Sequence, residues 1–87
     1  MDSRLKLFTA RVIARETGCP LWASAVDFRR TLSHIAFIPS KGVPTVALSE
    51  RPWCYYNPDF AASATIRELV GLLTHEALHI VAARKED

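Results

Sequence analysis

Apolar residues recur at helical spacing in the first part of the chain. Four of them fit one face of a helix from about residue 2 to residue 17: Leu5, Phe8, Val12 and Ile13. Gly18 and Pro20 follow, and this pair is typical of the end of a helix, so we expect the first helix to stop near Thr17. Residues 21–30 mix apolar and polar side chains and predict a second, shorter helix.

Three short runs rich in β-branched and aromatic residues occupy the middle of the chain. They are residues 34–38, residues 45–48 and residues 53–56. Residues 40–42 predict a turn, and the connection over residues 49–52 is short enough for a hairpin. The Asn-Pro-Asp sequence at residues 57–59 should break the last run, because proline cannot donate a hydrogen bond to a sheet. We therefore expect a small antiparallel sheet of about three strands.

A last helix is predicted from about Thr65 to Ala83. Thr65 with Glu68 has the pattern of a capping box at its start. The apolar residues of this segment share one broad side of the helix, which predicts that this side packs on a core: Ile66, Leu69, Val70, Leu73, Ala77, Ile80 and Val81. Helices at the N-terminus, then a small sheet, then a C-terminal helix make the predicted fold class α+β.

The opposite side of the last helix carries an HExxH motif, His75-Glu76-Ala77-Leu78-His79. Four helical residues advance about 6 Å and rotate about 40° beyond a full turn, so both imidazoles leave the same face and can bind one ion. This donor set favours Zn²⁺ as the cofactor. Glu76 lies beside the histidines, where it can act as the base that activates water. The alternative interpretation is two surface histidines that share a helix by chance.

Composition and charge describe one small globular domain over residues 1–87. Cys19 and Cys54, without a secretory signal, indicate free thiols in a reducing compartment, with a single disulfide as the alternative. No apolar run approaches the roughly 20 residues of a membrane span, so we expect a cytoplasmic protein with no membrane partner. The net charge is +2 and the basic residues are dispersed along the chain, which disfavours a nucleic-acid partner.

Three phrases of the chain occur together in one known family. They are Val43-Pro44-Thr45, Tyr55-Tyr56-Asn57-Pro58-Asp59-Phe60, and Glu68-Leu69-Val70-Gly71 leading into the HExxH motif. Together they resemble a zincin-like metallopeptidase domain that is found, often beside von Willebrand A-like domains, in bacteria and phages. The resemblance implies a zincin-like fold, zinc held by His75 and His79, and a peptide or protein substrate. It also implies a virion-associated location if a phage encodes the chain.

The metal ligands are where this chain departs from the family pattern. Members often place a further histidine soon after the second histidine of the motif, and residues 80–87 contain none. Catalytic zinc ordinarily has three protein ligands and an open position for water. Glu86 and Asp59 are the first candidates for the third ligand, and His34 and Cys54 rank below them. A homo-oligomer, or a partner domain if the chain is truncated at its C-terminus, could also complete the site.

Tyr55 and Tyr56 point to opposite faces of their strand, so we expect one to pack on the core while the other borders a substrate cleft. Two functional hypotheses follow from these residues. The leading one is a zinc metallopeptidase, a hydrolase in which Glu76 activates water at the metal. The other is a non-catalytic, zincin-like structural or assembly component, for example of a phage particle or a larger complex. The small size of the chain and the missing third ligand favour this second hypothesis.

Overall fold

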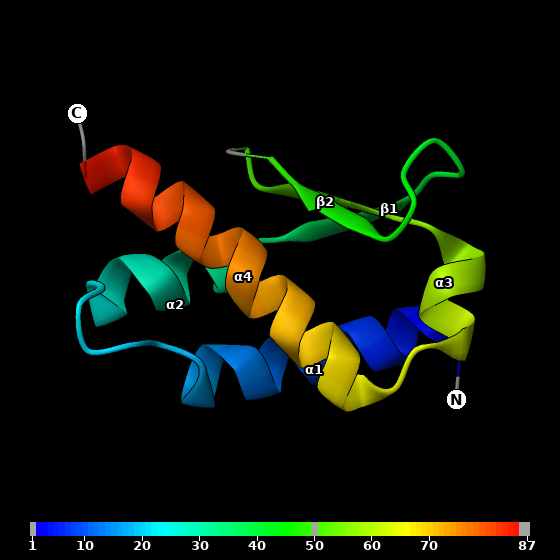
Figure 1. The fold of residues 1–87 in the computed structure, drawn as a ribbon, viewed down its shortest axis with the longest axis horizontal. Helices are drawn as coiled ribbons and strands as arrows, with labels where there is room; N and C mark the ends of the chain where they lie inside the picture. Colours follow the sequence, from blue (N-terminus) through cyan, green and yellow to red (C-terminus); the bar gives the residue numbers. More distant parts are fainter. Residues whose placement is uncertain (1, 50, 86–87) are drawn as a thin grey trace.

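The computed structural model describes residues 2–49 and 51–85 and shows helices packed on one side of a small sheet (Figure 1). In chain order the elements are α1 (Ser3–Thr17), α2 (Ala25–Ser33), β1 (Ala36–Pro39), β2 (Val46–Leu48), β3 (Trp53–Tyr56), α3 (Pro58–Ser63) and α4 (Ile66–Lys85). The long helix α4 contacts α1, α2 and β2, so it joins the helical layer to the sheet. The predicted α+β class is confirmed.

Helix α1 begins and ends as its sequence predicts. The side chain of Asp2 caps its start by accepting a hydrogen bond from the Arg4 N–H at 2.8 Å. At its end the Gly18 N–H donates to the Ala14 carbonyl. A Cβ atom at Gly18 would lie only 2.7 Å from Thr74 Oγ1 and 2.8 Å from the Ala14 oxygen. The lack of a side chain at Gly18 therefore lets the end of α1 approach α4 closely.

Helix α2 starts and ends later than the predicted range of 21–30. Ser24 Oγ accepts a hydrogen bond from the Asp27 N–H and caps the first turn, which is why the helix begins at Ala25. Phe28 and Leu32, one turn apart, are both fully buried and extend the helix to Ser33. As a consequence His34 is the C-cap of α2, and the first strand starts at Ala36 instead of residue 34.

The sheet has the order β1-β3-β2. β2 and β3 form the predicted antiparallel hairpin, in which Leu48 is opposite Cys54. β1, however, runs parallel to β3, with Phe37 opposite Cys54, so the prediction of a wholly antiparallel sheet was wrong. Because β3 lies between β1 and β2, the connection from β1 to β2 passes the end of β3, and β1 and β3 point the same way.

Helix α3 was not predicted. Residues 57–59 do end β3, but they also start a helix: the Asn57 side chain accepts hydrogen bonds from the Asp59 and Phe60 N–H groups. Pro58 occupies the first helical position, where its missing N–H costs nothing. The same three residues therefore terminate a strand and cap a short helix.

One hydrophobic core lies between the helical layer and the sheet. Its large members come from every layer: Leu7, Phe28, Leu32, Phe37, Tyr56, Leu69 and Leu73. Of the apolar stripe predicted on α4, Leu69, Leu73, Ala77, Ile80 and Val81 are buried. In the described part of the chain, no helix combines the length and the apolar character needed to cross a membrane.

Candidate metal centre

The position of α4 fixes which of its side chains reach the surface. A capping box starts the helix: the Thr65 N–H donates to Glu68 Oε1 at 3.0 Å, and the Glu68 N–H donates to Thr65 Oγ1 at 3.1 Å, as predicted. Burial of Leu73 and Ala77 turns the other side of the helix outward. His75 and His79 lie on that outward side and are both exposed.

The two imidazoles are close enough to share one ion. His75 Nε2 and His79 Nε2 are 3.0 Å apart, and the ring planes are nearly perpendicular, at 87°. A tetrahedral zinc ion with Zn–N bonds of about 2.0–2.1 Å would hold two nitrogens about 3.3 Å apart. The two nitrogens, which form a hydrogen bond with each other in the absence of an ion, are thus separated by nearly the distance between two zinc ligands.

Glu76 completes a compact group of three possible ligands. The donor atoms of His75, Glu76 and His79 all lie within 4.8 Å of one another. Glu76 is half-buried, and its Oε1 accepts a hydrogen bond from the Leu48 N–H at 3.3 Å. This bond reaches from α4 to β2 and fixes one oxygen of the carboxylate beside the imidazoles.

The Leu48 N–H points away from the sheet because of the register of the β2–β3 hairpin. The flanking bonds, from the Ser49 N–H to the Trp53 carbonyl and from the Asn57 N–H to the Thr45 carbonyl, show that the odd-numbered residues of β2 bond to β3. Leu48 lies between two such positions, so its N–H faces the open edge of the sheet. The three-residue group therefore lies between the outward side of α4 and the free edge of β2.

Cys54 lies inside this arrangement but is not poised as a ligand. It is fully buried and faces Leu48 across the hairpin. Burial raises the pKa of the Cys54 thiol to about 12, and the nearby negative charge of Glu76 adds to the increase. Without a metal ion the thiol therefore remains protonated at neutral pH, and Cys54 does not belong to the group of His75, Glu76 and His79.

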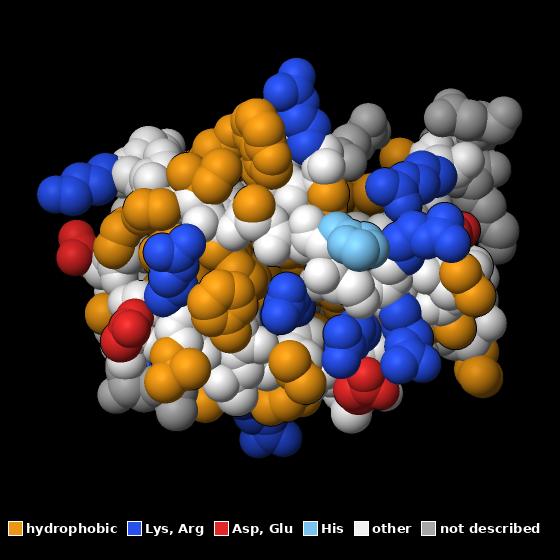
Figure 2. Space-filling model, turned by 180° about the vertical axis from the view of Figure 1, so that it is seen from behind, with side chains coloured by type: hydrophobic (Ala, Val, Ile, Leu, Met, Phe, Trp, Pro, Cys, Tyr) orange, Lys and Arg blue, Asp and Glu red, His pale blue; other side chains and the backbone are white. Residues whose placement is uncertain are grey.

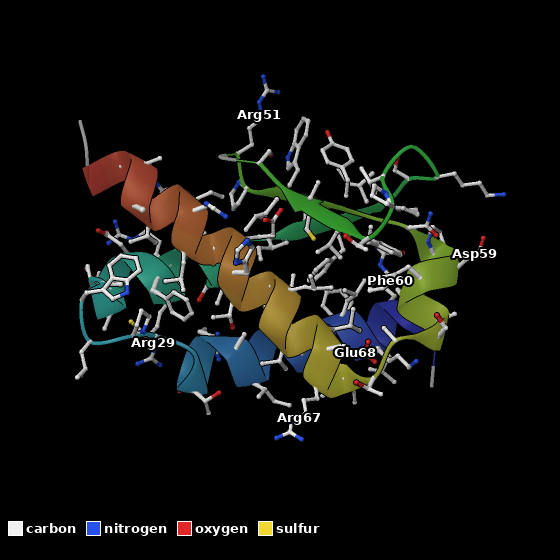
Figure 3. The ribbon with its side chains drawn as sticks, viewed as in Figure 1. Arg29, Arg51, Asp59, Phe60, Arg67 and Glu68 are labelled. Atoms are coloured by element: carbon white, nitrogen blue, oxygen red, sulfur yellow. The ribbon has the colours of Figure 1, made fainter. Side chains whose placement is uncertain are left out.

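The other proposed third ligands are not brought to the group. Asp59 is exposed on α3, away from the middle of α4 (Figure 3), and His34 is exposed at the end of α2. Across the described residues, no histidine, cysteine, aspartate or glutamate beyond His75, Glu76 and His79 belongs to the group. Glu86 lies outside the described residues.

The two tyrosines are divided between the faces of the sheet, as predicted. Tyr56 is buried in the core. Tyr55 lies on the opposite face, where its ring packs edge-on against that of Trp53 with 6.4 Å between centroids. Since Cys54 and Tyr56 mark the face that meets the helices, the structure does not bring Tyr55 to the histidines.

One contact of the site could not be recognised from residue types, namely the backbone N–H of Leu48 that bonds Glu76. A backbone donor has no side-chain signature. The only available signal was the predicted hairpin, which places residue 48 on a strand but does not reveal which of its edges meets the last helix.

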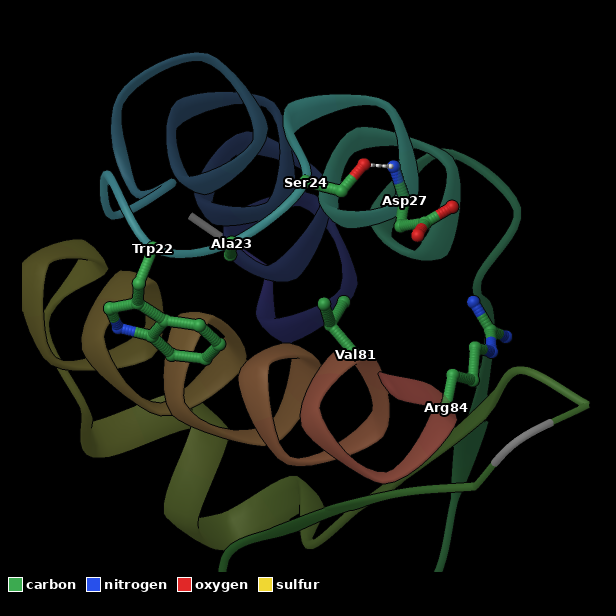
Figure 4. Close-up of a pocket in the computed structure, with 6 residues that line it drawn as sticks. All are labelled: Trp22, Ala23, Ser24, Asp27, Val81 and Arg84. Carbon is green, nitrogen blue, oxygen red and sulfur yellow. Dashed lines mark hydrogen bonds between the residues drawn. The ribbon is translucent and has the colours of Figure 1, made fainter. Parts of the chain in front are cut away.

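A cavity of about 380 Å³ is at a different place. It lies between the segment before α2 and the C-terminal end of α4 (Figure 4). Its walls are formed by Trp22, Ala23, Ser24, Asp27, Val81 and Arg84. None of these is a member of the metal-ligand group, so the cavity is not the recess of that site.

No family model matches the chain, and no curated protein or solved structure matches it. The resemblance to zincin-like metallopeptidases therefore stays a prediction.

Proposed function

We propose that the chain is a zinc-dependent metallopeptidase domain in which His75 and His79 hold Zn²⁺ and Glu76 activates water. The observation that carries the proposal is the 3.0 Å separation of the two Nε2 atoms beside a carboxylate that is fixed by β2. Two neutral imidazoles are ligands that zinc prefers. A zinc ion there would act as a Lewis acid and make water a better nucleophile near neutral pH.

The chain's own groups have separate tasks in this proposal. Glu76 accepts the proton of the attacking water, and the Leu48 N–H keeps its carboxylate oriented toward the histidines. Because His75 and His79 are exposed, an ion that they held would be accessible to a peptide substrate. We place this activity in the cytoplasm, or in a virion if a phage encodes the protein.

The small number of possible zinc ligands favours a second, non-catalytic function. The described residues supply two imidazoles and one carboxylate from a single helix, and catalytic zinc ordinarily has three protein ligands besides water. If Glu76 ligates zinc, it is no longer free to serve as the base. The domain would then be a non-catalytic zinc-binding assembly component, or its site would be completed by a second copy or a partner domain.

Metal content and hydrolysis distinguish these functions. Purified protein loaded with zinc should retain about one equivalent after dialysis, measured by elemental analysis, and His34→Ala serves as a control that removes a histidine outside the group. Glu76→Gln should keep zinc and lose hydrolysis of a broad peptide library by roughly 10²- to 10⁴-fold if Glu76 is the base. Loss of zinc from Glu76→Gln would assign the carboxylate as a ligand and support the assembly function.

Zinc affinity measured over a range of protein concentrations tests how the site is completed. Affinity that rises together with self-association would show that a second copy supplies a ligand. Affinity that does not depend on protein concentration would restrict the ligands to one chain.

A further inference from the structure

Five arginines that are dispersed in the sequence form one surface in the fold. Arg11 and Arg15 belong to α1, Arg29 and Arg30 to α2, and Arg84 to α4; we call this surface the basic face. Figure 2 shows Lys and Arg side chains gathered over the half of the molecule where α2 and the end of α4 lie.

Direct contacts link the three helices of the basic face. Arg15 Nε and an Arg29 amine both bond to the same carboxylate oxygen of Glu16, at 3.1 and 3.2 Å. Arg84 reaches α2 by donating to Thr31 Oγ1 at 3.1 Å. Arg29 therefore lies beside the end of α1, and Arg84 lies against α2.

The basic face carries more positive charge than its acids balance. Glu16 is shared between two arginines, and Asp27 is the acid within α2. Among the residues that the structure describes, five arginines and these two carboxylates leave an excess of three positive charges. The side chain of Arg30 is exposed and makes no hydrogen bond or ion pair with any of them. The guanidinium of Arg11 lies over the Phe8 ring, 5.5 Å from its centroid, and its Nε is buried without a hydrogen-bond partner among the described residues.

We propose that the basic face binds the phosphate backbone of a nucleic acid. Each cation is an arginine, whose planar fork of donors matches the oxygens of a phosphate. Their distribution over three helices suits a ligand with several phosphates in succession, which can engage separated guanidiniums at once. The sequence alone disfavoured this partner, because its basic residues form no continuous block. In the fold, the packing of α1, α2 and α4 brings these separated arginines close together.

An anionic membrane is the alternative partner for this surface. Binding in a bilayer interface requires a broad apolar face beside the cations. On α2 the exposed residues are Ala25, Val26, Arg29 and Arg30, so Val26 is the single large apolar side chain there. Val12 and Ile13 of α1 and Leu21 and Trp22 before α2 are also exposed, so binding to anionic lipid vesicles is measured beside binding to nucleic acids.

Fluorescence anisotropy with labelled nucleic acids tests the proposal. Full-length protein is titrated into a 20-base-pair DNA duplex, the matching single strand and the matching RNA duplex, at 50 and 200 mM salt. We expect binding to at least one of them at 50 mM that weakens at least about tenfold at 200 mM, as counterion release predicts. Absence of binding at 50 mM to all three probes overturns the proposal.

A matched pair of charge reversals locates the binding surface. Arg30→Glu/Arg84→Glu should weaken binding at least about tenfold, because it reverses two charges on the basic face. Arg51→Glu/Arg67→Glu makes the same change in net charge elsewhere: Figure 3 shows Arg51 above the sheet and Arg67 near the start of α4. This control should bind within about threefold of wild type, and equal losses in both variants would show attraction by net charge alone, against the proposal.

Single variants, a check of folding and two other anionic ligands complete the experiment. If Arg84→Glu disturbs folding by removing the bond to Thr31, Arg30→Glu is compared with Arg67→Glu, since Arg30 has no described contact to lose. Circular dichroism checks that each variant is folded. Tighter binding to anionic lipid vesicles or to polyglutamate than to every nucleic acid would assign the face to a different partner and overturn the proposal.

Discussion

The candidate metal centre and the basic face are built in opposite ways. All three donor groups of the metal centre come from five consecutive residues of α4, and helical geometry alone brings the two imidazoles together. The basic face takes its arginines from α1, α2 and α4, between residues 11 and 84, and exists only when these helices pack. The first can be recognised by spacing, whereas the second is invisible until the chain has folded.

The two regions also depend differently on the stability of the fold. A pair of residues one helical turn apart keeps its spacing wherever the helix persists. The basic face depends on tertiary contacts such as the Arg84–Thr31 bond and the shared Glu16. We therefore expect the two regions to respond differently to substitutions in their own residues and alike to damage in the core.

The largest expected effect is on the metal centre alone. His75→Ala/His79→Ala removes both imidazoles and should lower zinc affinity by more than about a hundredfold, measured by competition with a chromogenic chelator. Nucleic-acid binding should stay unchanged in this variant. Arg30→Glu/Arg84→Glu is the reciprocal variant, and it should bind zinc as wild type does. Zinc retention by the double histidine variant after mild chelation would show that His75 and His79 do not form a metal site.

A core substitution should damage both regions together. Leu73→Ala, at a fully buried position of α4, should lower the free energy of unfolding by about 2–5 kcal/mol, because it leaves a cavity between the helices and the sheet. Urea denaturation measures the loss, and Leu72→Ala, at the half-buried neighbouring position, should cost clearly less. If Leu73→Ala is no more destabilising than Leu72→Ala, the described packing of α4 is incorrect.

A smaller effect is expected at the start of α4. Thr65→Ala removes the hydroxyl that accepts from the Glu68 N–H and should cost about 1 kcal/mol in the free energy of unfolding. Thr9→Ala is a suitable comparison, because Thr9 Oγ1 bonds only the Leu5 carbonyl of its own helix. We expect thermal denaturation to show a lower melting temperature for Thr65→Ala and little change for Thr9→Ala.

The smallest effect should appear as a pH dependence. The hydrogen bond from the Thr65 backbone N–H, and then that from its side chain, lowers the pKa of Glu68 below its ordinary value. A lowered pKa in the folded state gives stability that is present above the ordinary pKa and is lost as the pH falls through the lowered value. The stability difference between wild type and Glu68→Ala should therefore shrink below about pH 4. A difference that is constant from pH 7 to pH 3 would contradict the ionised capping box.

Several elements could be predicted because their signals are local. The capping box of Thr65 and Glu68, the apolar stripe around Leu73 and the tight β2–β3 connection all act within a few residues. The predicted helix and strand boundaries were wrong where one short sequence is compatible with two local structures. Residues 57–59 end a strand and also cap α3, and Ser24, rather than the apolar residues before it, sets the start of α2.

The sequence by itself determined the approach of the two imidazoles, because the spacing of His75 and His79 becomes a 3.0 Å approach of two nitrogens in any α-helix that adopts these rotamers. Only the tertiary structure decided the parallel pairing of β1 with β3, the bond from Leu48 to Glu76 and the gathering of the arginines. These features join residues between 17 and 53 positions apart, and their formation depends on the packing of the whole core. Short-range spacing carries no information about such contacts.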